Sequence, residues 1–339
     1  MNLDARDIGA AWLGRDLKER KDWTQQLSEI EIQEFVLASQ RIEEGLSTED
    51  LSISFLTWLP TLTARLQQIQ NDLEYASGAV TLHGFPLKQV GRKNAEVLFF
   101  CMLEKIGTPI SQSIQGDKVF HVRDEGYVSN DPRARGPSSS KRLTFHSDRC
   151  DVIGFLCFQP AKQGGENQIV SSVALYQRMK EERPDLLAVL QQPFWYKRHN
   201  VDSGNEHAYY QQPVFSFHEG RFASSLLRVL IDRAYDSGDT PEMTSTQREA
   251  LDLIETWSLD PSMHLEFRQK SGDILLLNNF VTLHRRKAFE DHAEVEQQRH
   301  LLRVWLSMPN SRPLHPLFKS SYGNTNAGAI RGGMRRVGS

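Results

Sequence analysis

Two histidines and one aspartate are the residues of this sequence best suited to chemistry. His146 and Asp148 stand two positions apart in the stretch Leu143-Thr-Phe-His-Ser-Asp148, and His284 lies far downstream. In an extended strand, side chains at positions i and i+2 point to the same side, so His146 and Asp148 can face one point. Two imidazoles and one carboxylate on one face of Fe(II) leave the remaining coordination positions open for a co-substrate and oxygen. The three residues therefore predict a facial iron site.

Two arginines near the end of the sequence suggest what the co-substrate could be. If residues 299–306 form the last strand, Arg299, Leu301, Arg303 and Trp305 share one face of it. Burying two arginines on an otherwise apolar face is costly without an anion. A guanidinium pairs with a carboxylate through two parallel hydrogen bonds. A dicarboxylate held by the metal at one end and by Arg299 or Arg303 at the other would satisfy both demands. The alternative is a structural salt bridge to an acid of the chain.

The segments around these residues read as short strands with helical cover. Residues 150–159 are apolar on both alternating faces, as in a strand buried on both sides. Residues 78–86, 194–197, 214–218 and 272–279 also have strand character. Residues 1–75 read as helical, with a capping box at Ser28–Glu31 and an apolar stripe at Leu62, Leu66, Ile69 and Leu73.

These elements predict a mainly β fold with helical cover, built on a double-stranded β-helix (jelly roll). We expect a single domain over residues 1–339, with N-terminal helices over 1–75 and the jelly-roll core over 78–310. A helical insertion is expected at about 222–257, and a surface-wrapping or frayed tail at 319–339. A second pair with ligand spacing, His264 and Glu266, is interpreted as part of a strand or loop outside the barrel.

Composition narrows the functional classes. The 339 residues contain 40 Lys+Arg and 43 Asp+Glu, a formal net charge of -3, which gives no electrostatic footprint for nucleic acid. No apolar run approaches the roughly 18 residues of a membrane span, and the N-terminus has no signal-peptide pattern. The cysteines Cys101, Cys150 and Cys157 are odd in number and form no CxxC pair, which argues against a disulfide framework. We therefore expect a cytoplasmic protein that binds neither nucleic acid nor membranes.

The motifs together resemble the taurine dioxygenase/clavaminate-synthase-like superfamily of Fe(II)- and 2-oxoglutarate-dependent oxygenases. The resemblance spans roughly residues 78–310, and it is the order and spacing of the segments that make it specific. The matching segments are Leu143-Thr-Phe-His-Ser-Asp148, the turn Gly164-Gly-Glu166, Gly272-Asp-Ile with Asn278-Asn279, His284-Arg-Arg-Lys-Ala-Phe289 and Arg299-His-Leu-Leu-Arg303.

The resemblance implies roles for individual residues. His146, Asp148 and His284 would bind iron, and Arg299 would hold the distal carboxylate of 2-oxoglutarate, with Arg303 as the alternative. Relatives usually have a threonine after the Gly-Gly-acid turn that also bonds this carboxylate. Here the residue is Asn167, whose amide can still donate a hydrogen bond.

The resemblance also implies the reaction. Molecular oxygen and 2-oxoglutarate would be consumed, with release of succinate and carbon dioxide, while the substrate is hydroxylated, desaturated or cyclised. Asp148 favours hydroxylation over halogenation, because halogenating relatives lack this carboxylate.

The substrate is expected to be a small amino-acid-like or carboxylate-bearing metabolite, an expectation that rests on analogy between folds. Its contacts should come from loops around 119–126 and 200–212; the first of these belongs to a long loop, residues 111–140, that is expected to form a lid or rim of the active site. Arg123 is a candidate anchor for a substrate acid, or else a solvated loop charge, and Phe145 or Tyr210 could form an apolar wall. Two other hypotheses stay open: a cupin-like metal enzyme that does not use 2-oxoglutarate, and a non-catalytic jelly-roll binding module.

Overall fold

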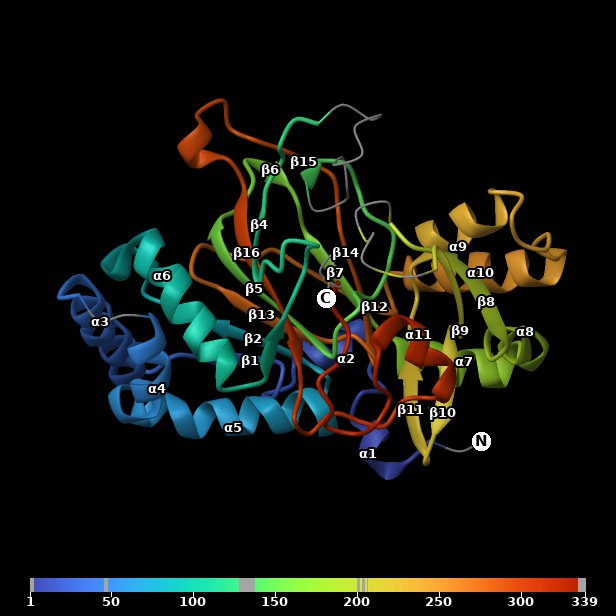
Figure 1. Ribbon diagram of the computed structural model, residues 1–339, viewed down its shortest axis with the longest axis horizontal. Coiled ribbons are helices and arrows are strands. Elements are labelled where there is room, and N and C mark those ends of the chain that lie inside the picture. Colours follow the sequence, from blue (N-terminus) through green and yellow to red (C-terminus); the bar gives the residue numbers. More distant parts are fainter. Residues whose placement is uncertain are drawn as a thin grey trace.

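The computed structural model describes residues 3–45, 48–127, 138–199, 202, 205 and 207–334 (Figure 1). Its centre is a large, mostly antiparallel sheet. The strands follow the order β1 (Thr24–Gln26), β2 (Ala79–His83), β13 (Ile274–Asn278), β5 (Val152–Gln159), β16 (His300–Ser307) and β3 (Thr108–Ile110), and β4 (Val119–Val122) also pairs with β16. Only the β1–β2 pair is parallel.

The central strands of this sheet are apolar on both faces because both faces are covered. In β13, Ile274 and Leu276 belong to the core beneath the helices, whereas Leu275 and Leu277 line a cavity on the other side. Strand β16 alternates in the same way, with Leu302 facing the helices. This period of two places successive side chains on opposite sides, so one strand can serve a core and a site at once.

Four helices cover the outer face of the large sheet: α3 (Glu29–Glu43), α4 (Thr48–Trp58), α5 (Pro60–Tyr75) and α6 (Leu87–Glu104). They stand together on one side of the molecule in Figure 1. The predicted capping box is confirmed, because the Ser28 side chain accepts from the Glu31 amide and Glu31 accepts from the Ser28 amide. The predicted apolar stripe of α5 is also confirmed as buried (Leu62, Leu66, Ile69 and Leu73). Two shorter helices, α1 (Ala5–Ile8) and α2 (Gly14–Lys18), precede this layer.

A smaller sheet faces the large one. It has the order β12 (His264–Phe267), β7 (Asn167–Ser171) and β14 (Thr282–Arg286). Close by, β6 (Gln163–Gly164) pairs with β15 (Phe289–Glu290). Ile169 of β7 packs with Ile153 and Leu275 of the large sheet, so the two sheets enclose a shared core.

The outer face of the small sheet has its own cover. Val170 and Leu283 pack against a second group of helices and hairpins, which lies opposite α3–α6 in Figure 1. The helices are α7 (Ser172–Glu182), α8 (Pro184–Leu190), α9 (Arg228–Tyr235) and α10 (Ser245–Ser258). The hairpins pair β8 (Pro193–Lys197) with β9 (Tyr209–Pro213), and β10 (Phe215–His218) with β11 (Arg221–Ser224).

Three expectations need correction. The fold is mixed α/β rather than mainly β, because 37% of the chain is helix and 23% strand, the cover being larger than the sheets. The segment 222–257 begins inside β11 before it becomes helical in α9 and α10. The loop expected over 200–212 contains the start of β9, whose polar residues gave no strand signal.

The tail does more than wrap the surface. After the 3₁₀ turn Pro316–Phe318 and helix α11 (Lys319–Tyr322), the chain runs back to residues 149–151. Arg331 is 2% exposed, and its Nε donates to Asp151 Oδ1 at 2.7 Å. The Gly333 amide donates to the Arg149 carbonyl at 2.8 Å. Up to Met334, the end of the described chain, the tail therefore packs against the segment that carries His146 and Asp148. No helix among the described residues is long and apolar enough to cross a membrane.

Candidate metal centre

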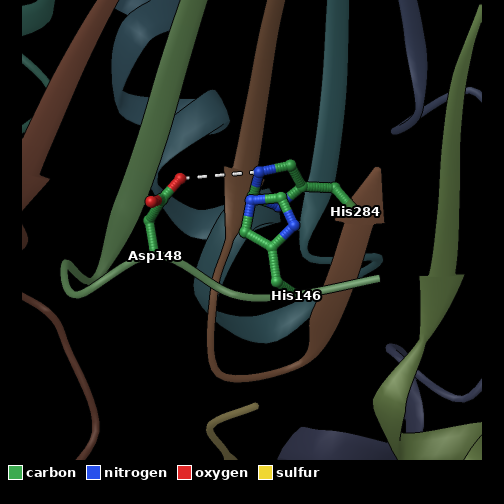
Figure 2. A group of neighbouring side chains, drawn as sticks. All are labelled: His146, Asp148 and His284. Atoms are coloured by element: carbon green, nitrogen blue, oxygen red, sulfur yellow. Dashed lines mark ion pairs between the residues drawn. The ribbon is translucent and has the colours of Figure 1, made fainter. Parts of the chain in front are cut away.

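The structure brings His146, Asp148 and His284 together. One ligand atom of each lies within 4.8 Å of the others, and they form the single such group among the described residues. Figure 2 shows His146 and Asp148 on one loop and His284 on the facing strand, with His284 Nε2 3.5 Å from Asp148 Oδ2. His146 and Asp148 do not belong to a full strand as expected: His146 forms one isolated antiparallel bridge with His284. This bridge is what fixes the two histidines side by side, with ring centres 4.4 Å apart.

Backbone and side-chain contacts hold these three residues in place. The His146 and His284 amides donate to each other's carbonyls at 3.0 and 2.9 Å. His146 Nδ1 contacts the Thr144 carbonyl at 2.9 Å, which leaves its Nε2 for a metal. Asn279 Oδ1 accepts from the Asp148 amide at 2.9 Å, and Asn279 is fully buried. Contacts of this kind orient metal ligands before any metal arrives.

The charge states of His146 and Asp148 suit a divalent metal. Burial, and then the neighbouring His284, lower the pKa of His146 to about 4, so its imidazole is neutral at neutral pH. Burial alone would raise the pKa of Asp148, but His284 and the positive charge of Arg303 bring it well below its usual value. His284 Nδ1 is buried without a hydrogen-bond partner among the described residues. Neutral imidazoles and an ionised carboxylate are the donor set that Fe(II) takes in a facial triad.

A cavity of about 420 Å³ opens beside the triad, between the two sheets. Its walls include Phe155, Leu275 and Leu277 of the large sheet and Ile169 of the small one. The apolar walls exclude water from part of the space, which strengthens the electrostatic contacts made inside it.

Arg299 and Arg303 both line this cavity, as the predicted shared face of the last strand requires. Each is 5% exposed. Arg299 Nη1 is buried and has no hydrogen-bond partner among the described residues, and its guanidinium carbon lies 5.2 Å from the Phe289 ring centre. Burial lowers the pKa of Arg299 to about 10, so it remains a cation at neutral pH. The alternative prediction, a structural salt bridge to an acid of the chain, does not hold. Neither Arg299 nor Arg303 forms an ion pair with a described carboxylate.

Asn167 and Arg303 have protein partners as well. Asn167 lines the cavity at the start of β7, and its Nδ2 donates to Gln269 Oε1 at 3.1 Å. Arg303 Nε donates to Gln112 Oε1 at 2.7 Å, and its guanidinium carbon lies 5.0 Å from the ring centres of Phe120 and Trp305. One donor of Arg303 is therefore engaged by the protein, whereas the buried Nη1 of Arg299 has no partner among the described residues.

Of the three predicted substrate residues, one lines the cavity and two do not. Tyr210 lines the cavity, as expected for a wall residue. Arg123 is not among the residues that line the cavity: its side chain is half exposed, and its Nε donates to Glu125 Oε1 at 2.6 Å. Phe145 also stays outside the cavity lining and packs in the core behind the small sheet, 6.0 Å from the His264 ring centre. Its apolar side chain follows the alternation that turns His146 the other way.

The competing pair His264 and Glu266 is not a metal site. It lies in β12, which is an edge strand of the small sheet and not outside it as expected. The His264 ring is satisfied by the Ser258 carbonyl at 3.0 Å and by Gln168 Nε2 at 3.0 Å, and Glu266 pairs with Lys287.

Sequence reasoning missed two residues of this region. Asn279 appeared only as part of a motif, and its contact with Asp148 depends on a tertiary approach. Arg286 stands two residues after His284 and so shares its face of β14. It is 6% exposed, lines the cavity, and donates from Nη1 to the Ser139 carbonyl at 2.8 Å and from Nη2 to the Lys141 carbonyl. The i, i+2 spacing from His284 was the signal that could have found it.

Comparison with known proteins agrees with this geometry. The sequence matches the family described as taurine catabolism dioxygenase TauD, TfdA family, over residues 39–305. FR-33289 synthase from Streptomyces rubellomurinus is 28% identical over 310 residues, which cover 89% of this chain and 90% of that protein.

Two solved structures share the fold. Asparagine oxygenase, in complex with Fe(II), 2S,3S-3-hydroxyasparagine and succinate, superposes with a TM-score of 0.65 at 17% identity, covering 84% of this chain and 93% of the other. The non-heme iron oxygenase OrfP, in complex with Fe and alpha-ketoglutaric acid, gives 0.62 at 16% identity, covering 84% and 94%.

These matches decide among the three hypotheses in favour of the oxygenase, over a cupin-like enzyme without 2-oxoglutarate and over a binding module. The protein belongs to the TauD/TfdA family and is an Fe(II)- and 2-oxoglutarate-dependent dioxygenase that acts on a small molecule.

Proposed function

We propose that His146, Asp148 and His284 bind the iron, that Arg299 holds the distal carboxylate of 2-oxoglutarate, and that the enzyme hydroxylates a small, amino-acid-like, carboxylate-bearing metabolite. The observation that carries the proposal is the Nη1 of Arg299, which has no hydrogen-bond partner in the described part of the chain and belongs to a buried cation in the same cavity as the triad. A buried guanidinium without a counter-ion is costly, and a carboxylate bound in the cavity removes that cost.

Arg299 and Arg303 take different parts in this proposal. The positive charge of Arg303 acts on the triad, because it helps to lower the pKa of Asp148. One of the Arg303 donors is engaged by Gln112. We assign Arg299 to the co-substrate and Arg303 to the acid group of the substrate. A substrate held at Arg303 would have its carbon chain beside the iron, which is the placement that C–H oxidation needs.

Asn167 is the remaining co-substrate contact in the proposal. Its Nδ2 is directed to Gln269, so rotation of the amide is needed before it can donate to 2-oxoglutarate. Next to it, Gly164 and Gly165 adopt positive φ values of 73° and 72°. A Cβ on Gly165 would lie 3.7 Å from Arg299 Nε, an ordinary van der Waals contact, so the positive φ rather than a lack of space is what favours glycine there.

When bound, iron and 2-oxoglutarate together activate oxygen and supply the oxidising power for hydroxylation. The protein's own contribution is to hold both acids at fixed arginines and to line the site with Phe155, Leu275 and Leu277. Hydroxylation rather than halogenation follows from Asp148, whose carboxylate occupies the position that a halide would need.

The substrate class is supported by one relative's name, since asparagine oxygenase acts on an amino acid. The test is a panel of L-amino acids and related acids incubated with the Fe(II) enzyme, 2-oxoglutarate and oxygen, with succinate and product masses followed together. We expect one panel member to give succinate and a product heavier by one oxygen atom. The substrate class would be refuted if no acid of the panel stimulated succinate formation and a compound without an acid group did.

A further inference from the structure

The cavity contains far more positive side chains than negative ones. Two carboxylates line it, Asp148 and Asp202, and no other described acid does. The chain as a whole has a formal net charge of -3, so this concentration of positive charge is local. The lining arginines are eight: Arg142, Arg149, Arg198, Arg233, Arg285, Arg286, Arg299 and Arg303.

Most of these arginines have no carboxylate partner. Arg149 and Arg198 share Asp202, at 2.8 and 3.7 Å. The other six form no ion pair with any described acid, although several bond neutral groups, as Arg233 does with His199 Nδ1 at 3.2 Å. Elsewhere the fold matches buried arginines with acids, as Arg221 and Arg312 are matched by Asp7 and Glu74.

The iron and the co-substrate do not balance this charge. Fe(II) brings two positive charges and 2-oxoglutarate two negative ones, so together they leave the excess of six arginines over carboxylates unchanged. Arg299 is used by the co-substrate and Arg303 by one acid group of the substrate, as proposed above. Six lining arginines remain. Arg285 donates to Gln168 Oε1, and Arg286 donates to the Ser139 and Lys141 carbonyls. Of the other four, which we call the mouth arginines, Arg142 and Arg233 are exposed and Arg149 and Arg198 are largely buried.

We propose that the substrate carries a dianionic phosphoryl group, a phosphate monoester or a phosphonate, and that Arg142, Arg149, Arg198 and Arg233 receive it at the cavity mouth. The inference rests on the proposed function and names the part of the substrate that is not oxidised.

The arrangement of the four arginines favours a phosphoryl group over a second carboxylate. They come from four separate segments: before His146, after Asp148, after β8 and within α9. A carboxylate offers two oxygens and one charge, which serve one guanidinium well. A phosphoryl group offers three oxygens and up to two charges, and so accepts from several guanidiniums at once.

The test compares two isosteric acids, L-2-amino-4-phosphonobutyrate and L-glutamate, by calorimetric titration of the anaerobic Fe(II) enzyme saturated with 2-oxoglutarate. We expect the phosphonate to bind about tenfold more tightly or better, the value of one additional charge-assisted hydrogen bond. The preference should grow between about pH 5.5 and about pH 8, as the phosphoryl group loses its second proton.

Variants locate the effect. Arg142→Gln and Arg233→Gln should each reduce the preference for the phosphonate by about threefold or more. Arg248→Gln is the matched control, because Arg248 is an exposed arginine of α10 outside the cavity, and it should leave the preference unchanged. The exposed positions of Arg142 and Arg233 make loss of folding a minor concern, and thermal melts check it.

Three outcomes would overturn the inference: L-glutamate binding as tightly as the phosphonate, no measurable binding of the phosphonate at millimolar concentration, or equal effects of the mouth variants and Arg248→Gln. Failure of the proposed function looks different. In that case the visible charge-transfer band that 2-oxoglutarate produces on Fe(II) would already be missing from the starting sample.

Discussion

Replacing Arg299 by glutamine tests the assignment of the co-substrate site through two quantities: the stability of the ligand-free protein, which should not fall, and the affinity for 2-oxoglutarate, which should fall. In the protein without ligands, Arg299 is 5% exposed and its Nη1 has no partner among the described residues. Removing such a cation removes a desolvation cost. The free energy of unfolding of the ligand-free variant should therefore stay within about 1 kcal/mol of wild type or rise above it.

With 2-oxoglutarate the same change should be severe. A buried arginine–carboxylate pair that loses one partner costs about 2–4 kcal/mol, because the other charge is left unpaired. The dissociation constant of 2-oxoglutarate should then rise about 30- to 1000-fold. Arg299→Lys keeps the charge but loses the planar fork, and should weaken binding by about tenfold.

The assay is a titration of the anaerobic Fe(II) protein, followed through the charge-transfer band. A second ligand makes it specific: 2-oxovalerate keeps the keto acid that would meet the metal but lacks the distal carboxylate. Its affinity should be the same in wild type and in Arg299→Gln. The reasoning is refuted if both ligands lose affinity equally, or if Arg303→Gln, and not Arg299→Gln, separates them.

Three further perturbations follow from the structure. Arg331→Met should lower the free energy of unfolding by about 3–5 kcal/mol in chemical denaturation, because it leaves the buried Asp151 carboxylate without its partner; a loss under 1 kcal/mol would contradict the assigned role of the tail. Asn279→Ala should weaken Fe(II) binding about 10- to 100-fold in a chelator competition, since Asp148 loses a contact that orients it, whereas His264→Ala should not change it. The metal-free protein should lose stability as the pH falls from 6.5 towards about 4, because folding lowers the pKa of His146 and of His300 to about 4 and the unfolded chain then binds more protons in this window. Melts between those two pH values check this, and a free energy of unfolding that rises as the pH falls would contradict it.

The sequence predicted the parts of the fold that depend on local pattern. The capping box at Ser28 and the stripe of α5 need only neighbours along one helix, and both are as predicted. The two-faced apolar pattern of residues 150–159 likewise identified a strand covered on both sides, β5 (Val152–Gln159). Such patterns can be recognised in the sequence because the spacing of side chains on a helix or strand is fixed.

The metal group was predictable for a similar reason. His146 and Asp148 are linked by spacing, and His284 follows a strong apolar strand. What the sequence could not supply is how distant segments approach each other. The pairing of Arg331 with Asp151 joins residues 180 positions apart, and the tail around it is rich in glycine, which carries no pattern.

The sequence did not show which side chains near the site would line the cavity, because that depends on local contacts and on strand register. Arg123 was a substrate candidate and Arg286 was not. Arg123 pairs with Glu125 and does not line the cavity, whereas the register of β14 turns Arg286 into it. Phe145 precedes His146 by one position, so the alternation that turns His146 towards the cavity turns Phe145 into the core behind the small sheet.

The most direct test of the central claim is the anaerobic titration of the purified protein with Fe(II) in the presence of 2-oxoglutarate, for wild type and for alanine variants of the triad. We predict one charge-transfer band that saturates at one iron per chain in wild type and in His264→Ala, and that is lost in His146→Ala, Asp148→Ala and His284→Ala. A band of full intensity in any of the three triad variants would contradict the account.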